Sequence, residues 1–201
     1  MSKTVKRKQQ IRKTKFQKNK TLLAAALLLL FLFVILMVRG CGVRQGSPEA
    51  VVKSLIDSYA KGSQKNAIKC FGMKNPTEDL EKEIAASVKY FEAHGAKSVN
   101  IAYCDTLSES KDYTYVYIIY KFKLDNGQEY PCISTYMVNK VQSKYCVIPT
   151  ASVTAEMSKQ AVQDYAKFMT TDIYKEYIRD YETFTKKNPG YEEKIAGKIS
   201  L

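Results

Sequence analysis

The sequence predicts an α+β fold: an N-terminal transmembrane helix, three helices packed on a bent four-stranded antiparallel sheet, and a C-terminal helical extension. Three observations indicate this fold. A long apolar run lies near the N-terminus, apolar residues recur at helical spacing over residues 47–95, and a two-residue period follows over residues 98–150. Helices followed by a run of strands are typical of the α+β class.

Residues 1–20 are a basic arm. They hold nine Lys or Arg residues and no Asp or Glu, so only +3 of the formal net charge of +12 belongs to the rest of the chain. We expect the arm to lie in the cytoplasm against anionic lipid head groups, the alternative being a cytoplasmic partner or nucleic acid. The main domain has no basic stripe with interleaved aromatic residues, so we expect no nucleic acid to bind it.

Residues 21–39 are predicted to cross the membrane. The run over 22–38 holds seventeen apolar residues without interruption. As a helix it is about 25 Å long, and snorkelling by Lys20 and Arg39 extends it towards the ~30 Å of a hydrocarbon core. Because the basic arm precedes the run, the positive-inside rule places the N-terminus in the cytoplasm and the main domain outside. The chain is therefore expected in the cell membrane as a single-pass protein, with the lipid bilayer as a partner.

The fate of this segment has three readings. It is kept as a signal anchor, it is removed and Cys41 takes a lipid, or it is simply cleaved. The stretch Val38-Arg39-Gly40-Cys41 is similar to the lipobox of bacterial lipoproteins, although Arg39 stands where a small residue is usual. The first two readings both tether the domain outside the membrane, behind a linker at residues 40–46.

Three helices are predicted over residues 47–95. Ser47 and Pro48 are typical of a helix start. A short second helix follows, and Asn75, Pro76 and Glu78 predict that the third helix begins at Pro76. The apolar residues at helical spacing are Val51, Val52, Leu55, Ile56 and Tyr59 in the first helix, and Leu80, Ile84, Val88 and Phe91 in the third.

Four strands are predicted over residues 98–150. The stretch DYTYVYIIYKFKLDNG is rich in β-branched and aromatic residues and ends in a hairpin turn at Asp125-Asn126-Gly127. Alternation places Tyr113, Tyr115 and Tyr117 on one face of the sheet. There they either pack under a helix or form a binding wall. The opposite face carries Val116, Ile118, Tyr120 and Phe122.

Residues 151–187 are predicted to form the helical extension, and residues 188–201 a loose tail after the breaker Asn188-Pro189-Gly190. The second helix of the extension carries a wide apolar stripe that is rich in tyrosine. This stripe either packs on the sheet or forms an intermolecular contact. In the second case Tyr174, Tyr177 and Tyr181 are the candidate partner surface.

No recognisable set of catalytic or metal-binding residues occurs in the sequence. With one His and no C-x-x-C pair, neither a zinc-type metal site nor a cofactor is expected. Asp105 and Glu129 are the candidate carboxylates in the strands for an enzyme that combines an acid with a tyrosine, although a loop-facing charge near a strand end is the plainer interpretation of both. The cysteines that would lie outside the membrane either form disulfides, in three connectivities, or stay buried as free thiols; they are Cys70, Cys104, Cys132 and Cys146.

The opening SPEAVVKSLIDSYAKGSQKNAIKCF resembles the first helices of nuclear-transport-factor-two-like proteins, with a cap, an apolar helix, a Gly turn and a short helix ending in Phe. VNKVQSKYCVI is similar to the end hairpin K-x-G-K-W-Y-V of many bacterial members: Lys140, Lys144, Tyr145 and Val147 match, and the Gly and the Trp are absent. The resemblance covers residues 47–150. It implies a cystatin-like α+β domain of the lipoprotein-like kind tethered outside Gram-positive membranes, whose function is mostly unknown.

The resemblance also implies a conical cavity between helices and sheet, and Tyr59, Phe91 and Tyr117 are candidate lining residues. The chain combines a membrane anchor with no recognisable set of catalytic residues. This favours a membrane-anchored extracytoplasmic domain that is not an enzyme and that binds a protein partner or a second copy at the bacterial cell envelope. The alternatives are a small-molecule-binding domain that uses the cavity, or a scaffold component of a secretion or conjugation machine, in which a basic arm, a single span and this fold also occur.

Overall fold

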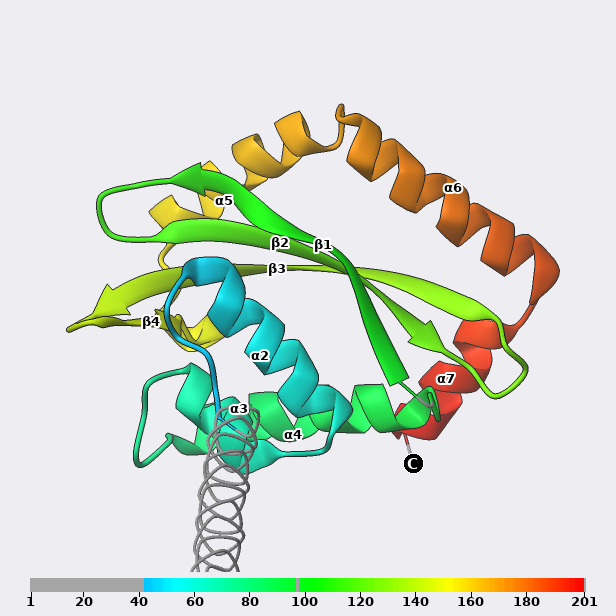
Figure 1. Cartoon of the computed structure of the whole chain (residues 1–201), viewed down its shortest axis with the longest axis horizontal. Coiled ribbons are helices and arrows are strands. Elements are labelled where there is room, and N and C mark those ends of the chain that lie inside the picture. Colours follow the sequence, from blue (N-terminus) through cyan, green and yellow to red (C-terminus); the bar gives the residue numbers. More distant parts are fainter. Residues whose placement is uncertain (1–41, 97, 201) are drawn as a thin grey trace, which may run out of the picture. The chain divides into compact units, whose positions relative to one another are not determined.

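The computed structural model describes residues 42–96 and 98–200 (Figure 1). Val43–Leu201 is a compact unit by itself. The basic arm, the apolar segment and Cys41 lie outside the described residues, so what the sequence predicts for them stays a prediction. Within the described part of the chain, no helix combines the length and apolar character that crossing a membrane requires.

The described elements follow the predicted α+β order, with helices first, then strands, then helices again. The first helices are α2 (Pro48–Ala60), α3 (Gln64–Cys70) and α4 (Glu78–Ala93). The strands are β1 (Ser98–Glu109), β2 (Thr114–Lys123), β3 (Glu129–Val141) and β4 (Lys144–Val147). A 3-10 turn (Thr150–Ser152) leads to α5 (Ala155–Phe168), α6 (Asp172–Lys187) and α7 (Tyr191–Ser200).

Side-chain caps fix where the helices begin. Ser47 accepts a hydrogen bond at its hydroxyl from a backbone N–H in the first turn of α2, and Pro48 is the first helical residue, as predicted. Helix α4 begins at Glu78 and not at Pro76, because Thr77 is the residue whose side chain accepts the capping bond, at 3.3 Å. The predicted start of the third helix was therefore two residues too early.

The four strands pair in sequence order, and neighbouring strands are antiparallel. Gly127, with φ +80°, lies in the predicted turn between β2 and β3. Strand β1 is at an edge of the sheet, and its register to β2 shifts between Ile101 and Tyr103 and between Thr106 and Ser108. Such bulges bend a strand and increase its twist, which accounts for the predicted bend of the sheet (Figure 1).

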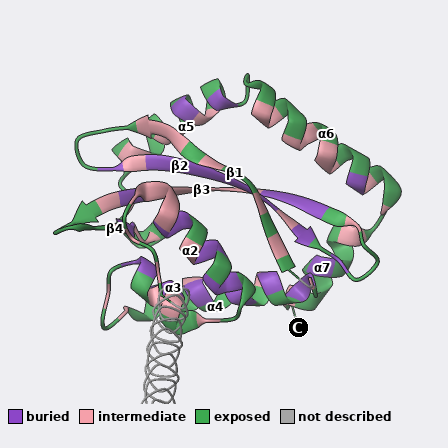
Figure 2. Ribbon diagram, viewed as in Figure 1, coloured by how far each residue is buried: buried purple, intermediate pink, exposed green. Residues whose placement is uncertain are grey.

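Helices cover both faces of the sheet (Figure 1). Helices α2 and α4 pack on what we call the inner face, and α5 and α6 on the outer face. Figure 2 shows α6 exposed on its outward side, with its half-buried and buried residues turned to the sheet. The strand tyrosines therefore pack under helices. The inner face carries Val116, Ile118, Tyr120 and Phe122, and the outer face Tyr113, Tyr115, Tyr117 and Ile119.

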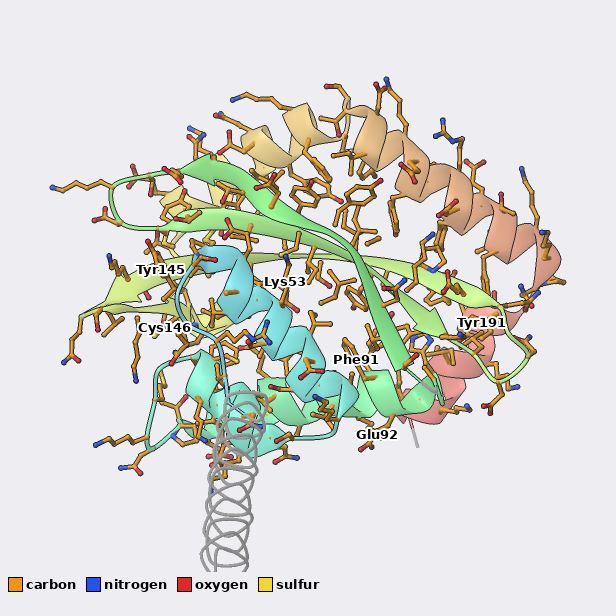
Figure 3. The ribbon with its side chains drawn as sticks, viewed as in Figure 1. Lys53, Phe91, Glu92, Tyr145, Cys146 and Tyr191 are labelled. Atoms are coloured by element: carbon orange, nitrogen blue, oxygen red, sulfur yellow. The ribbon has the colours of Figure 1, made fainter. Side chains whose placement is uncertain are left out.

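The last residues are not a loose tail, and that prediction is wrong. Residues 191–200 form α7, which packs against α4. Ile195 is 5% exposed, and the ring of Tyr191 lies 5.0 Å from the rings of Tyr130 and Phe184 (Figure 3). Helix α7 is short, and its apolar residues Tyr191, Ile195 and Ile199 recur at every fourth position. The packing of this face against the rest of the domain holds the helix in place.

Candidate functional site

A groove lies on the outer face of the sheet, where β1 passes the corner between α5 and α6. Its volume is about 430 Å³, within the range of small-ligand sites. We call it the β1–α5 groove. Its walls are Asp105, Thr106, Leu107 and Ser108 from β1, Tyr117 from β2, Asp164, Lys167 and Phe168 from α5, and Thr171 and Ile173 from the start of α6.

Asp105 and Tyr117 stand directly opposite each other across the β1–β2 ladder. The exposed carboxylate of Asp105 accepts a hydrogen bond from the amide of Thr106 at 2.8 Å. Burial, and then the charge of Asp105, raise the pKa of Tyr117 above its usual value. The phenol therefore keeps its proton at neutral pH and can donate a hydrogen bond, but it is a poor base.

Asp164 is a buried carboxylate, only 7% exposed, in the wall formed by α5. It accepts hydrogen bonds from Gln160 at 3.1 Å and from Lys167 at 3.2 Å. The bond from Gln160, and then the nearby hydroxyl of Ser108, hold the pKa of Asp164 below its usual range. Asp164 is therefore ionised, and it lies beside Ser108 of β1.

The corner between α5 and α6 is held by Thr171. Its hydroxyl donates to the carbonyl of Phe168 at 2.7 Å and accepts from the amide of Tyr174 at 3.3 Å, as the cap of α6. The Phe168 ring lies 4.4 Å from that of Tyr117. The groove thus has a fixed apolar floor, hydroxyl groups along β1, and two carboxylates with one ammonium in its walls.

The polar groups in the groove walls are carboxylates, hydroxyl groups, a phenol and an ammonium. Among residues 42–96 and 98–200, no cluster of three or more His, Cys, Asp or Glu could hold a metal ion. The four described cysteines are free thiols. None of them is among the groove-wall residues, although Cys104 directly precedes Asp105. Burial raises the pKa of each of them. Buried protonated thiols are poor nucleophiles. Asp105 and Tyr117 are the pair that could serve acid–base chemistry.

The predicted cavity residues do not meet in one cavity. Tyr59 and Phe91 lie together in the core on the inner face, with ring centroids 5.6 Å apart, and Phe91 stacks on Tyr120 at 5.5 Å. Tyr117 is on the outer face, across the sheet from both. The grouping of these three residues is therefore wrong, because the two-residue period of β2 turns Tyr117 and Tyr120 to opposite faces.

The predicted partner surface is turned towards the chain's own sheet. Tyr174 and Tyr177 pack on the cluster of Tyr117 and Phe168, and Tyr181 donates a hydrogen bond to Glu192 of α7. The three tyrosines are half-buried. In the structure the tyrosine stripe of α6 packs on the sheet, which was the first of the two interpretations.

Sequence reasoning missed the polar residues that α5 brings to the groove, Asp164 and Lys167. A signal for the first of them was present. Asp164 lies three residues after Ala161 and four before Phe168, so helical spacing puts this acid within the apolar stripe of α5. An acid in an apolar stripe indicates a buried carboxylate with partners elsewhere in the fold.

No family model matches the chain, and no curated protein matches it. Three solved bacterial structures are similar to it. A Campylobacter jejuni crystal structure, described as a proposed NTF2-like transpeptidase, has 19% identity and a TM-score of 0.35 over 52% of this chain and 99% of that one. An NTF-2 like protein of unknown function from Shewanella oneidensis MR-1 has 13% identity and a TM-score of 0.33 over 48% of this chain and 88% of that one.

The third is the solution structure of a SEC-C motif containing protein from Rhodopseudomonas palustris, with 16% identity and a TM-score of 0.38 over 57% of this chain and 83% of that one. Two of these three neighbours are described as NTF2-like, the family that the sequence resembles. At such low scores the likeness carries no function to this chain, and the fold assignment rests on the element order and sheet register given above.

Proposed function

We propose that the chain is a membrane-anchored extracytoplasmic domain without enzymatic activity, and that it binds a protein partner at the bacterial cell envelope through the β1–α5 groove. The single observation that carries the binding role is this groove of about 430 Å³, which combines an apolar floor with polar walls. The seventeen apolar residues behind a basic arm support the anchor and its orientation.

The groove fits an extended segment that carries a basic side chain next to an apolar one. Its walls hold two carboxylates, Asp105 and Asp164, and one ammonium, Lys167, which is already bonded to Asp164. The exposed carboxylate of Asp105 is thus the charge best placed for a cation from a partner. Leu107 and Phe168 offer apolar contact, and β1 is an edge strand, the kind of strand along which an extended segment can bind.

In-cell cross-linking tests this role. A photo-reactive amino acid replaces Lys167 in the groove wall or, as the control, Val162, which is 70% exposed on α5 and outside the walls. We expect a protein adduct from position 167 alone. Asp105→Asn, which keeps an acceptor for the Thr106 amide but removes the charge, should lower its yield about fivefold, while the exposed Asp112→Asn should not.

The proposal fails if positions 167 and 162 give the same adducts, or if Asp105→Asn changes nothing. The anchor is tested separately with the full chain in intact cells. Protease added outside should digest residues 43–201 and spare the basic arm; protection of residues 43–201 until lysis would contradict the proposed orientation.

A small-molecule ligand is the second candidate. Asp105 and Tyr117, which are paired across the β1–β2 ladder, both line the groove, and the volume of the groove is that of a small-ligand site. A ligand that binds the folded chain raises its thermal midpoint by mass action. A metabolite screen against wild-type protein and Tyr117→Phe would then find compounds whose midpoint shift is smaller in the variant. If the screen gives no shift, the small-molecule reading is abandoned while the protein-partner proposal stands on the cross-links.

A further inference from the structure

The segment before α2, residues 43–46, is attached to the domain by hydrogen bonds. Gln45 accepts a hydrogen bond at its carbonyl from the amide of Tyr145 at 3.0 Å, and its side-chain amide donates to the carbonyls of Tyr145 at 3.2 Å and Lys69 at 3.0 Å. The amide of Arg44 donates to the hydroxyl of Ser54 at 3.0 Å. Figure 3 shows Tyr145 and Cys146 beside this segment. Its place on β4 and α3 is therefore fixed.

Basic side chains surround this attachment. The ammonium of Lys140 lies 5.5 Å from the ring centre of Tyr145, and Lys144 lies across the β3–β4 ladder from Val141. Val141 is an exposed apolar residue, 49% accessible, at the tip of this hairpin. We call the exposed basic residues next to Gln45 and its partners, together with Val141, the tether surface; the basic residues are Arg44, Lys69, Lys140 and Lys144.

The length of the chain before Val43 limits how far this surface can be from a membrane. Residues 39–42 separate the apolar run from Val43. Fully extended, they span at most about 17 Å. The head-group layer on each side of a bilayer is about 5–8 Å thick. If the run spans the membrane, Val43 and the residues around it are held within or just above the head groups.

We propose that the tether surface rests on anionic lipid head groups of the membrane that anchors the chain. This inference rests on the proposed function, since it needs the anchor. A cationic surface within a Debye length of anionic lipid is attracted to it, and a fixed attachment turns that attraction into one orientation of the domain. Gln45 bonds to α3, which packs on the inner face, and to the edge strand β4. The β1–α5 groove is on the outer face, beside the opposite edge strand β1. The groove then faces away from the membrane, towards a partner.

The experiment uses the full chain reconstituted in vesicles of phosphatidylcholine, with or without about one-third phosphatidylglycerol. Flotation with the neutral vesicles reports the anchor alone. Hydrogen–deuterium exchange then reports the surface. We expect exchange over residues 139–145 and 65–70 to slow about fivefold in the anionic vesicles and exchange over α5 to stay unchanged, because α5 covers the other face.

The matched variants separate this surface from general charge. Lys140→Glu combined with Lys144→Glu should abolish the lipid dependence. Lys159→Glu combined with Lys175→Glu makes the same change in net charge on exposed positions of α5 and α6 and should leave it intact. Equal exchange in both vesicles, protection on α5 in place of the hairpin, or equal loss in both double variants would overturn the inference. Failure to float with neutral vesicles would instead overturn the anchor.

Discussion

His94 and Tyr191 join the end of α4 to the start of α7: Nδ1 of the imidazole lies 2.8 Å from the phenol oxygen. The imidazole is 6% exposed and stacks on Phe122, with ring centroids 4.1 Å apart and planes 12° from parallel. Its other nitrogen, Nε2, is buried and has no hydrogen-bond partner among the described residues. The site therefore holds the neutral imidazole of His94. In the protonated imidazolium both ring nitrogens carry a hydrogen, and the N–H at Nε2 would be buried without an acceptor among the described residues.

The stability of the domain should fall as the pH drops from about 6.5 to 4. Burial, and then the nearby ammonium of Lys198, lower the pKa of His94 to about 4, from about 6.5 in the unfolded chain. The unfolded chain therefore takes up the proton first, so stability is present above pH 6.5 and is lost as the pH falls through this window. Allowing for solvent screening, the loss is about 2 kcal/mol, measurable by urea unfolding at several pH values.

Two variants assign this loss to the imidazole. His94→Phe keeps the stacked ring and removes the titration, so its stability should no longer fall between pH 6.5 and 4.5. Tyr191→Phe removes the hydrogen bond and keeps the titration, so its stability should still fall. A wild-type slope in His94→Phe would show that other groups carry the effect.

Glu192→Gln should lower the stability of the domain much more than the same change at the adjacent Glu193. One of its carboxylate oxygens accepts from the phenols of Tyr130 at 2.8 Å and Tyr181 at 2.5 Å, which ties α7 to β3 and α6. Glu192→Gln weakens two hydrogen bonds to a charged acceptor and should cost about 1–2 kcal/mol. Urea unfolding measures the cost, and amide exchange in α7 should become faster. Glu193→Gln, in the same turn and exposed, is the control, and equal effects of the two changes would count against this role.

Gly72 should tolerate Ala far worse than Gly95 does. Both glycines end a helix with positive φ, +70° and +59°, so an Ala pays about 1 kcal/mol of backbone strain at either position. At Gly72 the new Cβ would also lie 2.5 Å from Sγ of the buried Cys146, whereas at Gly95 no atom of the described residues lies within 4 Å. We expect a loss of about 3 kcal/mol for Gly72→Ala. Thermal or urea unfolding checks it, and Cys146→Ala should restore part of the loss; without any rescue the clash is not the cause.

The helices and strands could be predicted because local signals agreed. Ser47 and Pro48 mark the start of α2, and the alternation in β2 sets its two faces. The start of α4 was missed because Asn75 and Thr77 are both capping types, and only the packed helix selects between them. Helix α7 was missed although Tyr191, Ile195 and Ile199 recur at helical spacing. This stripe is short, and it is stabilised by contacts that are distant in sequence, such as that of Tyr191 with His94.

The groove could not be predicted, since it depends on how α5 lies across β1. Asp164 and Ser108, which meet in its walls, are far apart in the chain, and no periodicity indicates their proximity. The resemblance drew attention to the inner face, where Tyr59 and Phe91 turn out to be core. Alternation did place Tyr117 correctly on the face opposite Phe122, but a face alone does not say which helix covers it.

The ion pair of Lys121 with Asp180 should couple the outer face of the sheet to α6. The two atoms lie 2.5 Å apart, with the side chains 25% and 41% exposed, and the bond raises the pKa of Lys121. In a double-mutant cycle with Lys121→Met and Asp180→Asn, the coupling energy should be about 1 kcal/mol or less, because both groups are partly solvated. The pair Lys175–Asp172, at 3.3 Å with Asp172 fully exposed, should show no measurable coupling.

Since α6 carries Ile173 of the groove wall, Asp180→Asn should also speed amide exchange in α6 and lower the yield of adducts from position 167. Undiminished adducts alongside a loosened α6 would mean that the groove is held by α5 alone.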